Sequence, residues 1–271
     1  MINLLYNNPA NNNADIGKKM SSQDAATPVN TNTPNNFEQD RDRLHLQMMS
    51  AVSHDLKTPL ASIIGSLEIH NKMNAALSAE KKTMLLETAL EEAYRLDGFI
   101  SNILDMARLE NGMTKVHKRE YEFEQIIQDC ILKIANLKEK AEIKVVKPSE
   151  LVMCETDASL LTRAFQCILD NAIKHSGNEK PKIQIDYTQV NDQIEMHVKD
   201  DGTGIPHGEE EKIFNKYTRI AKKDHKNAGT GLGLTLARAI IQLLGGHIHL
   251  QQSDKEGPYQ GACFKIVIPC K

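Results

Sequence analysis

The sequence predicts an α+β protein with two folded parts, a helical hairpin followed by an α/β sandwich. Through residues 38–110 apolar side chains recur at helical spacing, with one break near residues 72–79. From about residue 121, helical patterns alternate with short runs in which apolar and polar residues alternate, as they do in strands. Residues 1–37 are rich in Asn, Pro, Ser and Thr and lack periodicity, so they predict a disordered polar tail.

The first helix is expected over residues 38–70. Its apolar stripe consists of Val52, Leu56, Leu60, Ile63 and Leu67. Pro59 lies inside this helix and removes one backbone amide, which predicts a local bend.

The second helix is expected over residues 80–110, because Asn111-Gly112 is a helix-stop signal. Its apolar positions approach a heptad repeat: Leu86, Ala89, Leu90, Ala93, Leu96, Ile100, Ile103, Leu104 and Ala107. Two such helices leave an apolar seam, and pairing with a second copy would close it in a four-helix bundle. The alternative is that the seam packs against the downstream part of the same chain.

The second part, residues 113–271, is expected to contain helices at 126–140, 156–176 and 232–244. Residues 183–187 and 194–198 alternate as strands on either side of Asn191-Asp192, which indicates a β-hairpin. Residues 264–268 form a final strand. Helices and strands in this order indicate an α/β sandwich with a mixed sheet.

Composition excludes several classes of protein. The net charge of −3 does not suit a nucleic-acid-binding protein, which usually carries a strongly basic surface. The five cysteines show no metal-ligand spacing and are expected to be reduced and buried. No apolar run approaches the ~18 residues of a transmembrane helix, so a soluble cytoplasmic protein with no transmembrane segment is expected.

A histidine in the first helix faces away from its apolar stripe. At about 100° per residue, His54 lies roughly 200° from Val52. Asp55 is its neighbour, and Thr58 lies one turn further along the same face. An exposed imidazole beside a carboxylate and a hydroxyl suits chemistry on the ring, although a single helix histidine is more often just solvated.

Three further motifs follow in the second part. Their sequences are Asp170-Asn171-Ala172-Ile173-Lys174-His175 on a helix, Asp200-Asp201-Gly202-Thr203-Gly204-Ile205 after a strand, and Gly229-Thr230-Gly231-Leu232-Gly233-Leu234 at a helix start. An amide oxygen such as that of Asn171 can bind Mg²⁺, and helix-start amides can bind phosphate. Each motif alone is also compatible with an ordinary solvated helix face, an acidic turn or a glycine loop.

Together and in this order, the four motifs resemble the transmitter core of the sensor histidine kinases over residues 38–271. The run Leu104-Asp105-Met106-Ala107-Arg108 is similar to the KdpD-like kinases within that family. The resemblance implies a hairpin that dimerises and accepts phosphate, followed by a Bergerat-type ATP-binding domain. It also implies ATP and Mg²⁺ as ligands, a homodimer, and a response regulator receiver domain as partner.

The resemblance also assigns roles to residues of the second part. It makes Asn171 the Mg²⁺ ligand, Lys174 a phosphate contact, and Asp200 the acceptor for the adenine amino group. The other residues that it places around the nucleotide are His175, Gly202, Gly204, Ile205, Tyr217, Arg219, Gly229, Thr230, Gly231, Leu232 and Gly233. The chain departs from the family pattern at Cys167, where a second asparagine is usual, and at Lys216-Tyr217, where proline-phenylalanine is common.

For the hairpin, the resemblance implies that His54 takes the γ-phosphoryl group of ATP and passes it to the regulator's aspartate. Asp55 would take or polarise the Nδ1 proton. Thr58 would orient the water that attacks the regulator's aspartyl phosphate, which adds a phosphatase activity. Two alternatives are a serine kinase of the same ATP fold and a non-catalytic dimeric ATP-binding scaffold. The polar tail is too small for a sensor domain, so the signal is expected from a separate sensor protein unless the chain is truncated or unconventional.

Overall fold

The computed structural model describes residues 35–134, 141–218, 231–251 and 257–270, and the side chains among them from Val52 onward. The predicted polar tail therefore lies almost wholly outside the described residues. Residues 45–271 form one compact unit, and the contacts below belong to that unit.

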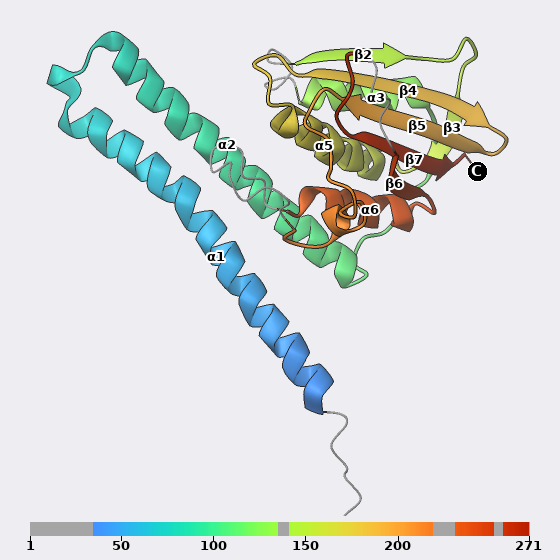
Figure 1. The fold of residues 1–271 in the computed structure, drawn as a ribbon, viewed down its shortest axis with the longest axis horizontal. Helices are drawn as coiled ribbons and strands as arrows, with labels where there is room; N and C mark the ends of the chain where they lie inside the picture. The colour runs from blue at the N-terminus through green and yellow to red at the C-terminus, as the bar shows by residue number, and fades with distance from the viewer. Residues whose placement is uncertain (1–34, 135–140, 219–230, 252–256, 271) are drawn as a thin grey trace, which may run out of the picture. The chain divides into compact units, whose positions relative to one another are not determined.

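The predicted helical hairpin is confirmed. Helices α1 (Asn35–Lys72) and α2 (Ala79–Glu110) run antiparallel and are joined by a short 3-10 turn at Asn74–Ala76 (Figure 1). Ser78 caps α2, since its hydroxyl accepts the Lys81 amide. Helix α1 continues through Pro59.

Many large apolar side chains of the hairpin lie on its surface. Only Ala89 and Phe99 are buried along α2. The exposed set includes Leu60, Ile64, Leu67, Leu86, Leu90, Ile100 and Leu104. Several of them belong to the predicted seam, so most of that seam is not covered by the described part of the chain.

The last turns of α2 differ from the rest of the hairpin, because side chains there contact the second part of the chain. Met106 and Leu109 pack against its core. The Arg163 guanidinium donates to Asp105 Oδ2 at 2.8 Å and to Asn102 Oδ1 at 2.9 Å. These four residues of α2 lie outside the predicted seam, so their contacts do not show the seam itself packing against the second part.

The second part is an α/β sandwich with a five-stranded mixed sheet of order β2-β4-β5-β7-β6. The strands are β2 (Glu142–Val146), β4 (Lys182–Val190), β5 (Gln193–Asp200), β6 (His247–Gln251) and β7 (Cys263–Pro269). Among the described strand pairs of this sheet, β2–β4 is parallel and the others are antiparallel. Strands β1 (Arg119–Glu122) and β3 (Met153–Thr156) form a separate antiparallel pair.

One face of the sheet is covered by the helices α3 (Phe123–Lys133), α5 (Ala158–His175) and α6 (Gly233–Leu243) (Figure 1). Their apolar faces and the inward side chains of the strands form one core. The predicted buried face of α5 is confirmed, since Leu161, Phe165, Ile168 and Ala172 are all buried. The outward side chains of the strands form the opposite face.

The β4–β5 hairpin is confirmed, with Val190 opposite Gln193 and Asn191 in the left-handed conformation. Helix α3 begins three residues before its predicted start, because Phe123 is fully buried against the rings of Phe165 and Tyr187. Residues 135–140, the predicted end of that helix, lie outside the described residues.

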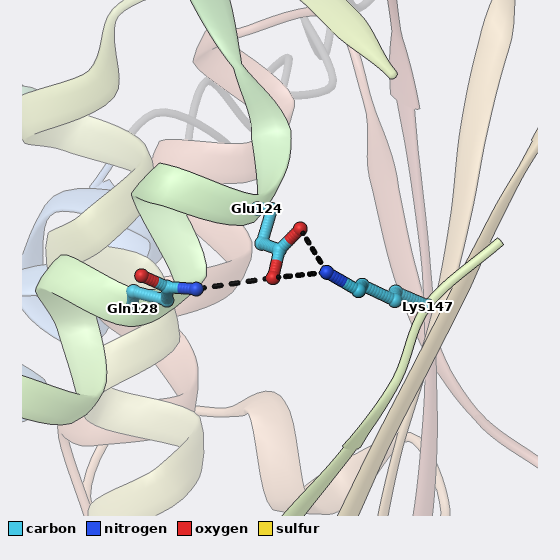
Figure 2. Close-up of polar contacts among 3 residues, drawn as sticks. All are labelled: Glu124, Gln128 and Lys147. Atoms are coloured by element: carbon cyan, nitrogen blue, oxygen red, sulfur yellow. Dashed lines mark hydrogen bonds and ion pairs between the residues drawn. The ribbon is translucent and has the colours of Figure 1, made fainter. Parts of the chain in front are cut away.

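An ion pair joins α3 to the segment after β2. Lys147 Nζ lies 2.9 Å from both carboxylate oxygens of Glu124, and Gln128 donates to the same carboxylate (Figure 2). Because Lys147 is more than half exposed, this pair contributes at most about 1 kcal/mol. Within the described ranges, no helix is both long and apolar enough to cross a bilayer.

Candidate active site

Helix α1 presents His54 to solvent, with 79% of its side chain exposed. Its Nδ1 lies 3.3 Å from Oδ1 of Asp55, whose side chain is mostly buried. The Asp55 carboxylate therefore lies next to one ring nitrogen, Nδ1, of a largely exposed imidazole. With the ring hydrogen on Nδ1 and donated to Asp55, Nε2 would carry the lone pair that a nucleophile needs.

Thr58 lies one turn after His54 and is also exposed. Its hydroxyl donates to the His54 backbone carbonyl at 3.2 Å, a common bond for a helical threonine. Since that bond uses the hydroxyl hydrogen, the lone pairs of Oγ1 are left as acceptors. The structure thus brings His54, Asp55 and Thr58 together on one stretch of helix.

The second group of predicted residues lies at the end of α5. Asp157 caps the start of this helix by accepting the amides of Ser159 and Leu160. Asn171 and Lys174 are half-buried, and the Lys174 ammonium lies 2.5 Å from Asp170 Oδ2. His175 is exposed in the last turn.

The turn after β5 meets this end of α5. A Cβ added at Gly202 would lie 2.5 Å from the His175 carbonyl oxygen, so only glycine fits there. The Asn178 amide also donates to Asp201 Oδ2 at 2.9 Å. Predicted residues from two motifs, His175 and Gly202, are therefore in contact.

Asp200 is the buried acid of the site, with 2% of its surface exposed. Its Oδ1 accepts the amides of Gly202 at 2.9 Å and of Ala262 at 2.8 Å, and Oδ2 takes neither. Burial raises the pKa of this carboxyl, and the two amides act in the opposite direction. Gly204, with φ of +71°, and the half-buried Ile205 continue the turn.

Gly261 is a residue of this site that the sequence analysis missed. A Cβ there would lie 1.9 Å from Asp200 Oδ1 and 2.4 Å from the Gly202 amide. Gly261 also donates its amide to the Asp200 carbonyl. The available signal was a glycine two residues before the final strand, but the residue that it contacts, Asp200, lies 61 residues earlier in the chain.

The start of α6 lies against α5 on the other side of Asn171. A Cβ added at Gly233 would lie 3.9 Å from Cys167, one helical turn before Asn171. Leu232 precedes α6 and is buried. Asn171 therefore lies on α5 between the position that contacts α6 and the position that contacts the turn after β5.

Helical spacing would put Cys167 on the polar side of α5, but the structure buries it, in agreement with the expectation of buried, reduced cysteines. Its side chain is 6% exposed and belongs to the core. Burial, the largest influence, raises the pKa of its thiol to about 12. Cys167, at the position where the family usually has asparagine, thus packs against the start of α6 and remains an uncharged thiol.

The residues that flank positions 218–230, Tyr217 and Gly231, contact each other. The Tyr217 amide donates to the Gly231 carbonyl at 3.0 Å, and both residues have positive φ, of 60° and 66°. A Cβ at Gly231 would lie 2.8 Å from the Tyr217 backbone, so the close approach requires glycine. Three other predicted site residues, Arg219, Gly229 and Thr230, lie outside the described residues.

Two protein-family models match these two parts. Residues 44–112 match the His Kinase A (phospho-acceptor) domain, and residues 156–271 match the histidine kinase-, DNA gyrase B- and HSP90-like ATPase. The first contains the His54 helix and the second contains the Asp200 site. The chain is a sensor histidine kinase transmitter core.

Relatives agree with this assignment. The chain is 29% identical to the sensor protein KdpD of Escherichia coli over 230 residues, which cover 85% of this chain and 25% of the relative. It is 27% identical to the sensor protein kinase WalK of Staphylococcus saprophyticus, covering 86% of this chain and 38% of the relative. This transmitter core thus spans only about a quarter to two fifths of the length of those proteins.

Solved structures share the fold. The Acinetobacter baumannii histidine kinase AdeS matches with a TM-score of 0.57 and 20% identity, covering 80% of this chain and 98% of AdeS. Full-length ShkA in complex with AMPPNP matches with a TM-score of 0.56 and 21% identity, covering 82% of this chain and 45% of ShkA. At this identity the likeness concerns the arrangement of helices and strands alone.

Proposed function

We propose that this transmitter core is an ATP-dependent protein-histidine kinase that phosphorylates His54. The observation that carries the proposal is the exposed His54 ring with the Asp55 carboxylate at its Nδ1. An imidazole that donates its Nδ1 hydrogen to Asp55 would offer Nε2 as a nucleophile without a further base. Residues 156–271, which match an ATPase family, would bind the nucleotide.

The geometry around Asp200 fits an adenine nucleotide. Two backbone amides fix Oδ1, so Oδ2 of the same carboxylate can accept the adenine amino group. The glycines at 202 and 261 hold the backbone close to this carboxylate, where any Cβ would intrude. Asn171 and Lys174, at the end of α5, would meet the phosphates and their Mg²⁺.

In the transfer step, the Nε2 lone pair of His54 forms a bond to the γ-phosphorus, and the bond from that phosphorus to the β-phosphate oxygen breaks. ADP leaves, and the Nδ1 proton moves toward Asp55. Mg²⁺ bound with ATP would neutralise charge on the phosphate oxygens. Asn171 suits that cation because its amide oxygen is a hard ligand.

The experiment that tests this function is incubation of the purified chain with γ-labelled ATP and Mg²⁺, followed by acid and base treatment. The expected label is lost in acid and kept in base, as a phosphoramidate is. Label that survives acid would support the serine kinase alternative. No label, with ATP still bound, would support the non-catalytic scaffold.

The phosphoryl group is proposed to pass next to an aspartate of a response regulator receiver domain. Thr58 supports a further phosphatase reaction on that regulator. With its hydrogen donated to the His54 carbonyl, Oγ1 can accept a hydrogen from a water and so aim that water's lone pair at an incoming aspartyl phosphate.

Substitutions at Asp55 and Thr58 should separate the two reactions. Asp55→Ala removes the partner of Nδ1 and should lower autophosphorylation by about two orders of magnitude or more. Thr58→Ala should keep autophosphorylation but slow dephosphorylation of the regulator. Thr58→Ser keeps the hydroxyl and should dephosphorylate the regulator at about the wild-type rate. The measurement is decay of the labelled regulator with ADP present. Equal decay for Thr58→Ala and wild type would remove Thr58 from the reaction.

The exposed apolar seam of the hairpin supports a homodimer that forms a four-helix bundle. Ile100→Asn combined with Leu104→Asn should weaken dimerisation by roughly two orders of magnitude or more, since both would bury an unpaired amide at the interface. Both residues are exposed in the single chain, so its own stability should change little.

Light scattering at micromolar concentration checks the dimer. Met84→Asn is the matched control, because Met84 is exposed on the same helix but lies off the heptad positions. A monomeric wild type, or a control that dissociates as readily as the double variant, would contradict the proposed bundle.

A further inference from the structure

The outward face of the sheet carries a pair of histidines that the kinase reaction does not use. In β6, Ile248 points into the core, so His247 and His249 on either side of it point outward together. Among the described strands, β6 is at the edge of the sheet and pairs with β7 alone. His247 is exposed and His249 is half-buried, so small solutes can reach their rings.

The two rings are parallel and close. Their centroids are 6.0 Å apart, and the planes differ by 13°. Two imidazoles that share one cation have centroids about 5–6.5 Å apart, which follows from a metal–nitrogen distance of about 2.1 Å and the size of the ring. The spacing therefore suits a shared cation after rotation of the side chains alone.

The neighbouring charges leave this pair suited to a cation. Lys265 lies opposite His249 in the register, but its ammonium is 2.7 Å from Glu195 Oε2. His197, the third histidine of this face, has its Nδ1 3.2 Å from Asp186 Oδ1. Glu195 thus offsets the charge of Lys265, and Asp186 already holds His197.

We propose that His247 and His249 chelate one divalent d-block cation of the Ni²⁺, Cu²⁺ or Zn²⁺ class, independently of the nucleotide. Imidazole selects these ions over Mg²⁺, which prefers oxygen ligands. Over the ranges that the structure describes, no group of three or more His, Cys, Asp or Glu residues is arranged to hold a metal. Water would therefore complete the coordination, and the bound ion would exchange readily.

Calorimetric titration of the untagged, metal-stripped full chain with NiCl₂, without ATP, tests this site. We expect one Ni²⁺ per chain in the tightest phase. His247→Asn and His249→Asn should each weaken that phase at least about tenfold, since each removes a ligand. Titration with MgCl₂ should show no binding to this pair.

Two other histidines provide the controls. His197→Asn removes a histidine from the same face, and His207→Asn removes an exposed one elsewhere, so neither should change the tight phase. The exposed position of His247 makes its substitution harmless to the fold, which a thermal melt verifies. Three results would overturn the proposal. They are wild-type Ni²⁺ binding by both β6 variants, an equal loss of binding in either control, and the absence of a one-to-one phase in the wild type.

Discussion

His54→Ala is expected to abolish incorporation of label from γ-labelled ATP, by at least about three orders of magnitude, because it removes the nucleophile itself. Nucleotide affinity should stay within about twofold of wild type, which is within about 0.4 kcal/mol. The His54 side chain is exposed and contacts Asp55, so its loss should not disturb the fold.

The matched control for this substitution is His70→Ala. His70 belongs to the last turn of the same helix and has no proposed role in the transfer. It should keep full labelling. Labelling of His54→Ala at the wild-type level, or an equal loss in His70→Ala, would remove His54 from the reaction.

Gly261→Ala is expected to abolish measurable ATP binding, a loss of at least about 100-fold in affinity. The added methyl group would lie 1.9 Å from Asp200 Oδ1 and 2.4 Å from the Gly202 amide, so the carboxylate and the turn must move apart. Overpacking of this kind typically costs about 1–3 kcal/mol of stability as well. Calorimetric titration with ATP and a thermal melt measure the two effects separately.

Two companion variants make this result specific. Asp200→Asn keeps the side-chain volume but replaces one acceptor oxygen by a donor, so it should lose ATP with less loss of stability. Gly98→Ala adds a methyl group on α2 where nothing lies within 4 Å, and it should bind ATP normally. Wild-type affinity in both Gly261→Ala and Asp200→Asn would show that the nucleotide binds elsewhere.

The helices of the hairpin and the buried face of α5 could be predicted because periodic apolar residues are a local signal. Strands β1, β2, β3 and β6 were not predicted. They are four or five residues long, too short for alternation to distinguish them from loops. The start of α3 was missed for a related reason, since the burial of Phe123 depends on Phe165 and Tyr187 far along the chain.

In the site, motif residues were identifiable but their surroundings were not. Asp200 stood out at a strand end, whereas its contacts with Gly261 and Ala262 depend on how β5 pairs with β7. The burial of Cys167 depends on the start of α6, because helical spacing sets a residue's angle on α5 but does not show which element covers that angle. Such contacts are tertiary, and no short window of sequence contains them.

The most direct test of the proposed kinase is to locate the phosphate on the chain after reaction with Mg²⁺-ATP. Mass spectrometry of peptides prepared at neutral to alkaline pH preserves phosphohistidine. The phosphate should be found on His54 and disappear after brief acid treatment. An acid-stable phosphate on Ser53 or Thr58, the exposed hydroxyl residues beside it, would contradict the assignment of His54 as the phosphoacceptor.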